Sequence, residues 1–413
     1  MAVRNRVYPA QLPGLREHCG QARYVWNLAV EQQSWYWPGR GPAPSPAGRY
    51  RQLAGARQAE PWLAAGSSSV QQQALRDFDR AMAAFFDPAS PARKPGYRSR
   101  RQVQGFAIRD TRSRRLNRRW GEVFVPKVGW VRFRWTRQLP ERPGVSRVTC
   151  DRAGRWHVSF PAPQPAVERE RAGHVAGIDR GVRTALVATD GQHYRAPAIS
   201  GRRAARYLAL QRKLSRQNKR SRNRERTKRQ MALITAAVTG RRKDWAEKIS
   251  TRLVRDNDVI VLEQLNTRGM VRRPEPKPDP DQPGAFLPNR ARAKAGLNRG
   301  ILASCWGLPG QRLQDKAAAS GVQVLFVNPR FTSQQCHACG HAQPGNRESQ
   351  AVFRCQQCGH LDHADRNAAL NILARGLPLL AAGEQVPAHA PGHGAPRQPP
   401  APAGAAGTTQ AAA

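Results

Sequence analysis

Four cysteines in the last quarter of the sequence have the spacing of a metal site. They form two pairs, Cys336-x-x-Cys339 and Cys355-x-x-Cys358, and 15 residues separate the pairs. Each pair can hold one ion from a tight turn, and two such turns complete a tetrahedron of thiolates, which is typical of zinc. Gly340 and Gly359 directly follow the pairs, where such a turn often requires a positive φ. Because four protein ligands leave no open coordination position, we predict a structural zinc ion.

The other cysteines and the nearby histidines are surplus to that site. His337, His360 and His363 are close in sequence, but the four thiolates already fill the ligand shell. The three remaining cysteines stand alone in apolar or strand-like segments, where thiols usually behave as small buried hydrophobic groups: Cys19, Cys150 and Cys305. An odd total of seven cysteines and the lack of an export signal favour a reducing compartment over a disulfide framework.

Three acidic residues border apolar segments in a chain that has few acids. Asp179 ends the apolar segment 174–178, Glu263 ends 259–262, and Asp365 opens an apolar helical stripe. Carboxylates at two strand ends and one helix start can converge at one edge of a sheet. Such a cluster binds two Mg²⁺ or Mn²⁺ ions, which activate water for phosphodiester cleavage.

Each acid also has a structural explanation. Asp365 could cap a helix, and Glu263 could be a charge that faces solvent at a strand end. Asp179 is harder to explain in this way, because it joins a buried type of strand to a glycine turn. The residues alone therefore leave the metal cluster and the structural roles about equally open. Three other aspartates are weaker candidates, because two lie in turns and one precedes its strand: Asp190, Asp362 and Asp258.

The charge balance indicates a polyanionic partner. Sixty-nine Lys and Arg residues face 28 Asp and Glu residues, and the net charge is +41. Self-repulsion opposes such a charge in a free protein, and nucleic acid is the usual partner for it. Residues 202–229 hold 13 basic residues and one acid, a density that favours phosphate contacts over a merely solvated helix face.

An anionic membrane surface is the other candidate partner. No apolar stretch approaches the roughly 18 residues of a spanning helix, and the N-terminus lacks the apolar core of a signal peptide. We therefore expect a cytoplasmic protein without a membrane partner.

Apolar spacing and turn residues outline the elements that must position these residues. We expect helices over 17–37 and 69–86 with a loop over 37–48, followed over 103–162 by an antiparallel barrel or sandwich. From Gly173 the pattern becomes α/β, with strands at 174–178, 185–189, 259–262 and 322–327 and helices at 202–229, 241–255 and 313–320. The Pro-rich stretch 272–288 reads as a flexible crossing or lid, and the chain after Val386 as a disordered tail.

Four blocks resemble, in order, the signature blocks of the TnpB (OrfB) family. These proteins are carried by bacterial insertion sequences and are related to the type V CRISPR nucleases. The blocks are Gly177–Val182, Val259–Asn266, Thr332–Gly340 and Asp365–Ile372, and Lys294–Ile301 with Trp306-Gly307 is similar to a further family block. The resemblance covers roughly residues 1–376.

The resemblance implies an RNA-guided DNA endonuclease. Asp179, Glu263 and Asp365 match the family's catalytic carboxylates, which hold Mg²⁺ or Mn²⁺, and Cys336, Cys339, Cys355 and Cys358 match its Zn²⁺ ligands. Its partners would be a guide RNA from the element's end and target double-stranded DNA, with base pairing reading the sequence. It would act in the prokaryotic cytoplasm, in association with the nucleoid.

The implied fold is multidomain, α+β and α/β. It has a wedge-like β-barrel with a helical insertion and a ribonuclease H-like RuvC nuclease domain with an inserted zinc ribbon. The boundaries are 1–16 and 101–163 for the barrel, 17–100 for the helical recognition segment, 164–330 and 359–380 for the nuclease domain, 331–358 for the ribbon and 381–413 for the tail.

Three other functions stay open at this point. The chain could be a cleavage-inactive RNA-guided DNA-binding regulator, a transposase that breaks and joins element ends itself, or a zinc-ribbon RNA-binding protein without enzymatic activity. Four aromatic residues of the first predicted helix could stack on bases, although their helical spacing favours core packing: Tyr24, Trp26, Trp35 and Tyr36.

Overall fold

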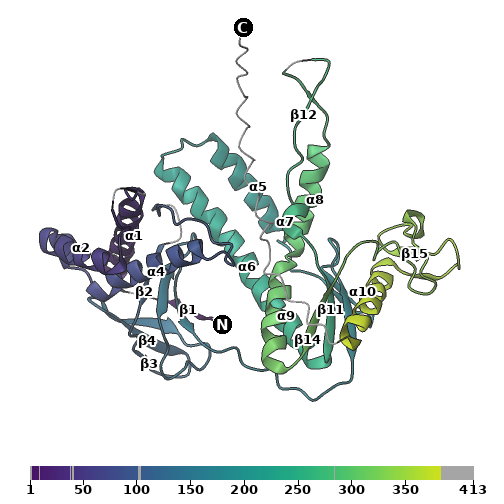
Figure 1. The fold of residues 1–413 in the computed structure, drawn as a ribbon, viewed down its shortest axis with the longest axis horizontal. Coiled ribbons are helices and arrows are strands. Elements are labelled where there is room, and N and C mark those ends of the chain that lie inside the picture. The colour runs from purple at the N-terminus through teal and green to yellow at the C-terminus, as the bar shows by residue number, and fades with distance from the viewer. Residues whose placement is uncertain are drawn as a thin grey trace, which may run out of the picture.

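The computed structural model describes residues 2–8, 10–37, 39, 41–100, 104–282 and 284–382. Helices and strands form two bodies side by side, each built on its own sheet (Figure 1). This confirms a mixed α and β protein of more than one part. The predicted tail lies outside the described residues from position 383 onward. Of the helices in the described ranges, none is long and apolar enough to cross a membrane.

The N-terminal body contains a seven-stranded antiparallel sheet in the order β2-β6-β7-β1-β5-β4-β3. Residues alternate between buried and partly exposed along β4 and β7, as expected when one face of a sheet covers a core. β1 lies in the middle of this sheet, where Val3 pairs with Phe160. The start of the chain and residues near 160 therefore belong to the same sheet. The strands are β1 (Ala2–Val7), β2 (Gln104–Ile108), β3 (Ser113–Arg115), β4 (Trp120–Val125), β5 (Gly129–Arg134), β6 (Ser146–Cys150) and β7 (Trp156–Pro161).

Four helices between β1 and β2 share the core of this sheet. Leu15 and Phe78 are fully buried beside Phe106, Phe133 and other sheet residues. The helices are α1 (Leu12–Ser34), α2 (Pro46–Ala59), α3 (Pro61–Ala64) and α4 (Ser68–Phe86). α1 begins five residues before the predicted start, because proline is tolerated in a first helical turn. The sequence did not reveal α2, which buries only two residues and therefore shows little apolar periodicity.

The second body contains a five-stranded sheet in the order β10-β9-β8-β11-β14. β8, β11 and β14 are parallel neighbours. β9 pairs antiparallel with β8, and β10 pairs antiparallel with β9, so β9 is the strand that runs against the others. Every residue of β11 is buried, which is typical of a central parallel strand. The strands are β8 (Val175–Asp179), β9 (Leu186–Ala188), β10 (His193–Tyr194), β11 (Val259–Glu263) and β14 (Gln323–Val327).

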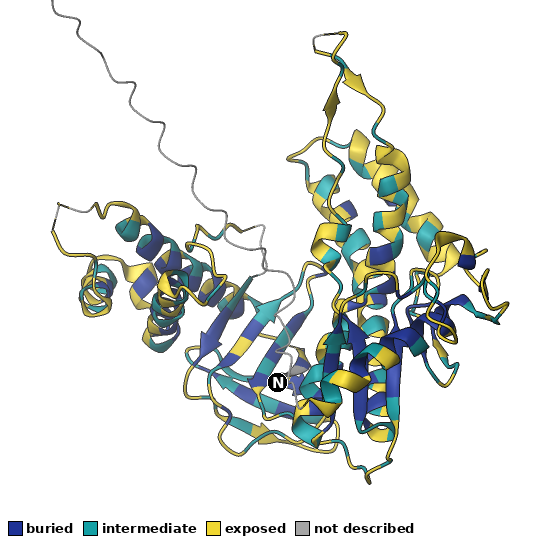
Figure 2. Ribbon diagram, turned by 45° about the vertical axis from the view of Figure 1, so that its right-hand side comes forward, coloured by how far each residue is buried: buried dark blue, intermediate teal, exposed yellow. Residues whose placement is uncertain are grey.

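Helices cover both faces of this sheet. α6 (Arg222–Asp256) and α9 (Gly307–Ser320) pack on the face that carries Ile178 and Ile260, whereas α10 (Ala364–Ala381) packs on Val261 and Leu325. α6 is one helix of 35 residues where the sequence predicted two. A break at 217–221 separates it from α5 (Gly201–Arg216), so the basic stretch forms a helical hairpin that is mostly exposed (Figure 2).

The Pro-rich stretch forms a narrow hairpin with strands β12 (Lys277–Pro278) and β13 (Phe286–Leu287). It follows α7 (Thr267–Met270) and precedes α8 (Ala291–Ser304), and it projects from the far end of α8 (Figure 1).

A small two-stranded sheet lies beside α10 and precedes it in the chain. The 3-10 turn η1 (Pro344–Asn346) leads to β15 (Val352–Arg354), which pairs with β16 (Leu361–His363). β16 runs directly into α10, so this hairpin extends beyond residue 358, the predicted end of the ribbon.

Candidate active site and four-cysteine centre

Three buried carboxylates lie near one another where β8 and β11 end. Asp179 is the last residue of β8 and Glu263 the last of β11, and the parallel register places these two ends at the same sheet edge. Asp365 lies in the first turn of α10, which packs across that sheet. The three residues are 9%, 5% and 9% exposed, respectively. The structure thus brings the three predicted residues together.

Burial raises the pKa of two of these carboxyl groups, Asp179 and Glu263. Burial, and then the charges of Glu263 and Asp365, together raise the pKa of Asp179 to about 7, against smaller opposing effects of Arg347 and a backbone N–H. Burial likewise raises the pKa of Glu263, although a hydrogen bond from Thr332 and the charge of Arg180 oppose the shift. Buried oxygen donors under mutual repulsion form a donor set that a hard divalent cation would stabilise.

Asp365 is not the cap of its helix. His363 occupies the N-cap position, and its Nδ1 accepts a hydrogen bond of 3.2 Å from the backbone N–H of Asp365. The N-cap explanation of Asp365 is therefore wrong, because the side chain is directed to the carboxylate cluster and to Arg347.

The three weaker aspartate candidates have structural partners instead. Asp362 forms an ion pair of 3.0 Å with Arg366, Asp258 accepts from Arg169 and from the backbone N–H of Gly173, and Asp190 accepts from the backbone of its own turn.

Three residues that the sequence did not single out surround the carboxylates. The Thr332 hydroxyl donates to Glu263 Oε1 at 2.6 Å, and Arg347 Nη2 donates to Asp365 Oδ1 at 2.8 Å. The Arg180 guanidinium donates to the backbone carbonyl of Glu263. Thr332 and Arg180 belong to two of the blocks that resemble the family, but Arg347 lies in the loop between the cysteine pairs and carries no spacing signal. Both Thr332 and Arg347 come from the segment around the cysteines.

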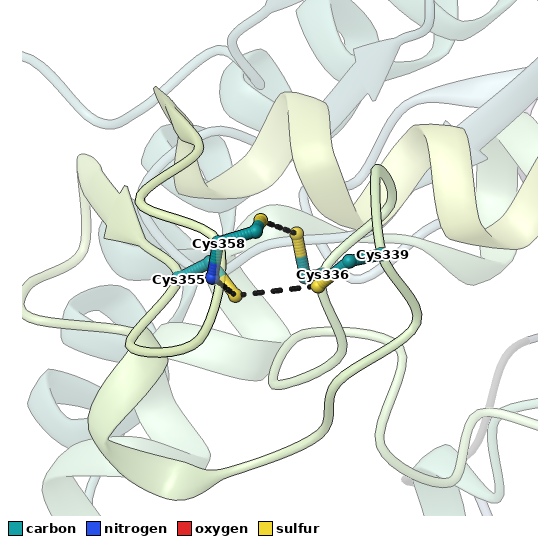
Figure 3. Close-up of side chains that lie close together, drawn as sticks. All are labelled: Cys336, Cys339, Cys355 and Cys358. Carbon is teal, nitrogen blue, oxygen red and sulfur yellow. Dashed lines mark hydrogen bonds between the residues drawn. The ribbon is translucent and has the colours of Figure 1, made fainter.

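The four predicted cysteines converge on one point (Figure 3). Their sulfur atoms lie within 4.8 Å of one another, and the pairs across the centre are 3.7 Å apart for Cys336–Cys358 and 3.5 Å for Cys339–Cys355. A regular tetrahedron with Zn–S bonds of about 2.3 Å would have sulfur atoms roughly 3.8 Å apart. The four thiols therefore fit a zinc ion.

Two glycine turns produce this convergence. Gly340 and Gly359 have φ values of +79° and +74°, and each donates its backbone N–H to the carbonyl of the first cysteine of its pair. Glycine reaches this left-handed conformation without the steric cost of a side chain. The structure confirms the glycine turns that the sequence predicted.

Two buried asparagines of α10 connect the cysteine centre to the carboxylates. Asn367 accepts from the backbone N–H of His337 and donates to the carbonyl of Gln335. Asn371 donates to the carbonyls of Thr332 and Gln335 at 2.9 and 2.6 Å. One loop thus carries the first cysteine pair, the hydroxyl that holds Glu263, and the backbone anchored to the helix of Asp365.

Predictions for residues outside this centre are confirmed only in part. Cys19 is buried, and burial raises the pKa of its thiol to about 12, whereas Cys150 and Cys305 are only half-buried. Of the four aromatic residues, Trp26 packs in the core, but Tyr24, Trp35 and Tyr36 are exposed. Core packing is therefore wrong for those three, because they lie on the outer face of α1 or after its end.

Comparisons with known proteins give matches over most of this chain. A family model described as "Probable transposase" matches residues 157–273, and one described as "Cas12f1-like, TNB domain" matches residues 306–372. The "Putative RNA-guided DNA endonuclease InsQ" of Escherichia coli (strain K12) is 34% identical over 328 residues, which cover 79% of this chain and 78% of that protein. The "Putative RNA-guided DNA endonuclease" of Streptomyces pristinaespiralis is 31% identical over 393 residues, with 93% and 91% covered.

One of the similar solved structures is the "Cryo-EM structure of the Cas12f1-sgRNA-target DNA complex". It covers 88% of this chain and 82% of its own, with 13% identity and a TM-score of 0.45.

Proposed function

This chain belongs to the TnpB (OrfB) family, and we propose that it is an RNA-guided DNA endonuclease, encoded by a transposable element, that cuts at the edge of its five-stranded sheet. The observation that carries this proposal is the convergence of Asp179, Glu263 and Asp365, buried, from two parallel strands and one helix. Two relatives named as RNA-guided DNA endonucleases match most of this chain and most of their own length.

The three carboxylates would hold two divalent cations, Mg²⁺ or Mn²⁺. When bound, the two ions would activate a water molecule and stabilise the leaving oxygen of a phosphodiester. The surrounding residues of the chain orient the ligands: the Thr332 hydroxyl fixes one oxygen of Glu263, and Arg180 holds the backbone of the same residue. Burial of the ligands keeps bulk water away, so each charge acts more strongly than it would in solvent.

Zn²⁺ would sit between the four cysteines in a structural role. Two sets of contacts support this role. The segment around the cysteines contacts Glu263 through Thr332 and Asp365 through Arg347, and Asn367 and Asn371 fasten the same segment to α10.

The sheet topology supports the implied domains. In the order β10-β9-β8-β11-β14, the first three strands are antiparallel neighbours, and β11 and β14 run parallel to β8. This arrangement suits a ribonuclease H-like RuvC domain over 164–330 and 359–380. The seven-stranded sheet suits the wedge-like barrel over 1–16 and 101–163, and α1–α4 suit the recognition segment over 17–100. The ribbon over 331–358 would be an insertion in the nuclease domain.

The partners follow from the family and from the charge. A guide RNA derived from the element's end would pair with the target strand of double-stranded DNA, and the protein would contact the backbones of both. The exposed basic hairpin of α5 and α6 supports this division, since it offers charge without base-reading specificity.

The test combines copurification with cleavage. The protein is produced beside its flanking DNA, the bound RNA is sequenced, and guide-matched targets are assayed with Mg²⁺. We expect cleavage that Asp179→Ala, Glu263→Gln and Asp365→Ala each abolish while RNA binding persists, and that the turn variant Asp190→Ala leaves intact. The proposal fails if no RNA copurifies and no guide-matched cleavage appears.

Two alternative outcomes have distinct signatures. Guide-dependent binding, with Asp179→Ala indistinguishable from the wild type in cleavage, would indicate a cleavage-inactive regulator. Strand-transfer products from element-end DNA, formed without RNA, would indicate a transposase that acts directly.

A further inference from the structure

A cavity in the N-terminal body is lined by positively charged side chains. It lies against the seven-stranded sheet, whereas the carboxylates belong to the five-stranded sheet. It has a volume of about 300 Å³ and opens between α1, the segment before β2, and strands β2 and β6. Three arginines line it, one from each of three elements: Arg23 from α1, Arg98 from the segment after α4, and Arg147 from β6. Three separate parts of the fold thus place guanidinium groups around one space.

Arg98 is held in place before any ligand binds. Its guanidinium lies 3.3 Å from the centre of the Trp26 ring. Its backbone is fixed by Asn27, which accepts from Arg98 N at 2.7 Å and donates to Arg98 O at 3.0 Å. Trp26 in turn donates its indole N–H to Gly96 O at 2.9 Å. Since stacking occupies one face of the guanidinium, its edge keeps its hydrogen-bond donors for a ligand.

The positive charge in the cavity is only partly balanced. Among the lining residues that the structure describes, none is acidic. Behind them, Asp77 of α4 forms an ion pair of 2.8 Å with Arg147. Burial and then repulsion from Arg100 lower the pKa of Arg23. Burial also lowers the pKa of Arg98, against the opposing charge of Asp77 and with a smaller contribution from Arg147. Asp77 therefore acts on two of the three cations, Arg147 and Arg98.

The rest of the lining suits a small oxyanion. Ser99 and Thr149 line it with side chains that carry hydroxyl groups. The Gln104 amide accepts from Arg23 and donates to the backbone carbonyls of Ser99 and Arg100, so it holds Arg23 in place. At Gly105, a Cβ atom would lie 2.9 Å from both the Thr149 methyl and the backbone oxygen of Val148, so glycine keeps this side of the cavity free. A volume of 300 Å³ is at the lower end of small-ligand sites.

We propose that the cavity formed by Arg23, Arg98 and Arg147 binds a phosphate group, namely one phosphodiester of a nucleic-acid strand. Planar guanidinium groups match phosphate oxygens with paired hydrogen bonds. The same chemistry would accept a free phosphate, so the source must be decided by experiment. This proposal does not depend on the nuclease site, because binding can be measured without cleavage.

The first arm of the test measures the salt dependence of binding. The affinity of the full chain for a fluorescent RNA strand and a DNA duplex is determined over a range of KCl concentrations. We compare Arg98→Gln and Arg147→Gln with Arg118→Gln, an exposed arginine in the turn between β3 and β4 that removes the same charge. Loss of one phosphate contact lowers the slope of log K against log salt by about 0.7 for single strands and 0.9 for duplexes.

We expect each cavity variant to lower the slope by about this amount. The double variant should lower the slope little further, because both arginines bind the same phosphate. Arg118→Gln should change the slope much less. Arg98→Lys, which keeps the charge but loses the paired donors, should bind more weakly than the wild type. Melting temperatures show whether Arg98→Gln still folds, and Arg147 is exposed enough to be replaced safely.

The second arm uses inorganic phosphate as the probe. Calorimetric binding of phosphate that is lost in Arg98→Gln, together with an unchanged nucleic-acid slope, would assign the cavity to a free phosphate ligand. If both cavity variants behave like Arg118→Gln in the salt series and bind phosphate like the wild type, the proposal is overturned.

Discussion

At the scale of single residues, Asp179 is the carboxyl group of the site whose pKa is raised most clearly. Its carboxyl is buried at the end of β8 with two other acids beside it, and its pKa is raised to about 7. In the unfolded chain an aspartate releases its proton near pH 3.9. The folded protein therefore holds a proton that the unfolded chain has lost over the interval between these values.

The first prediction concerns stability against pH without divalent ions. Because the pKa of Asp179 is higher in the folded protein than in the unfolded chain, this residue favours the folded state at low pH. The free energy of unfolding therefore falls as the pH rises toward about 7. We expect the melting temperature of Mg²⁺-free, zinc-loaded protein to fall from pH 5 to pH 7.5. Asp179→Asn should flatten this dependence, and equal pH profiles of variant and wild type would contradict the assignment.

The second prediction concerns the hydroxyl of Thr332, which donates to Glu263 Oε1. Thr332→Val keeps the shape but removes this donor, so the pKa of Glu263 rises and its affinity for cations falls. A hydrogen bond to a charged group contributes about 1.5–3 kcal/mol, so we expect roughly a tenfold higher Mg²⁺ requirement for cleavage. Thr332→Ser, the matched control, should keep the wild-type Mg²⁺ titration, and an unshifted titration for valine would show that the contact is dispensable.

The residues of the site differ in how far the sequence could predict them. The cysteines could be predicted from spacing alone, because a metal centre demands short pairs. The carboxylates needed the family blocks, because a buried ligand and a helix cap look alike in one sequence. Arg347 could not be predicted, since its contact with Asp365 depends on how the loop between the cysteine pairs folds back.

At the scale of elements, the cysteine centre and the helix of Asp365 behave as one unit. Asn367 and Asn371 fasten the first cysteine turn to α10, and Thr332 extends from the same turn to β11. Loss of the ion would release this turn, and with it the contacts to Glu263 and Asp365.

The third prediction is that zinc removal lowers both stability and cleavage. A zinc chelator or Cys355→Ser should lower the melting temperature and abolish cleavage, because thiolates without the ion no longer hold the two turns together. Cys305→Ser, outside the cluster, serves as the control and should retain cleavage. Full cleavage by zinc-free protein would refute the coupling.

The fourth prediction tests the close packing of β8 on α10. A Cβ atom at Gly177 would overlap the carbonyl oxygen of Ala369 and lie 2.8 Å from the Leu373 nitrogen. Gly177→Ala must therefore displace α10 and Asp365, and we expect a loss of about 1–3 kcal/mol of stability and a large loss of cleavage.

Gly240 of α6 offers the matched control, because no atom lies within 4 Å of its Cβ position. Gly240→Ala should be neutral or stabilising by up to about 1 kcal/mol. If both alanine variants were equally active and stable, the packing argument would be wrong.

The elements could be predicted where burial produces a pattern. β8, β11 and β14 are apolar because the sheet is covered on both faces, so the sequence located them within a residue or two. α2 and the long continuation of α6 are mostly exposed, and an exposed helix has no apolar stripe to reveal its length.

At the scale of the whole molecule, charge dominates the behaviour of the free protein. The net charge is +41, and basic side chains cover α5, the exposed faces of α6 and much of the N-terminal body. Their repulsion opposes the compact state until a polyanion neutralises it.

The fifth prediction follows from this repulsion. RNA at a hundredfold excess over its Kd should stabilise the fold by about 2.7 kcal/mol, which a thermal melt would show as a higher transition temperature. The rise should shrink as salt is added, because ions screen the contacts. A melting temperature that RNA leaves unchanged at low salt would contradict a polyanionic partner.

The cysteine centre lies in the chain between the second carboxylate and the third, and this order has a consequence during translation. Glu263 is synthesised about a hundred residues before Asp365, and everything between them must be made before the site can close. The N-terminal body, which has a core of its own, can fold while the ribosome is still working. A product that stops short of α10 would therefore keep cationic surfaces and lack a cutting site, and we expect it to compete with the intact protein for the same nucleic acid.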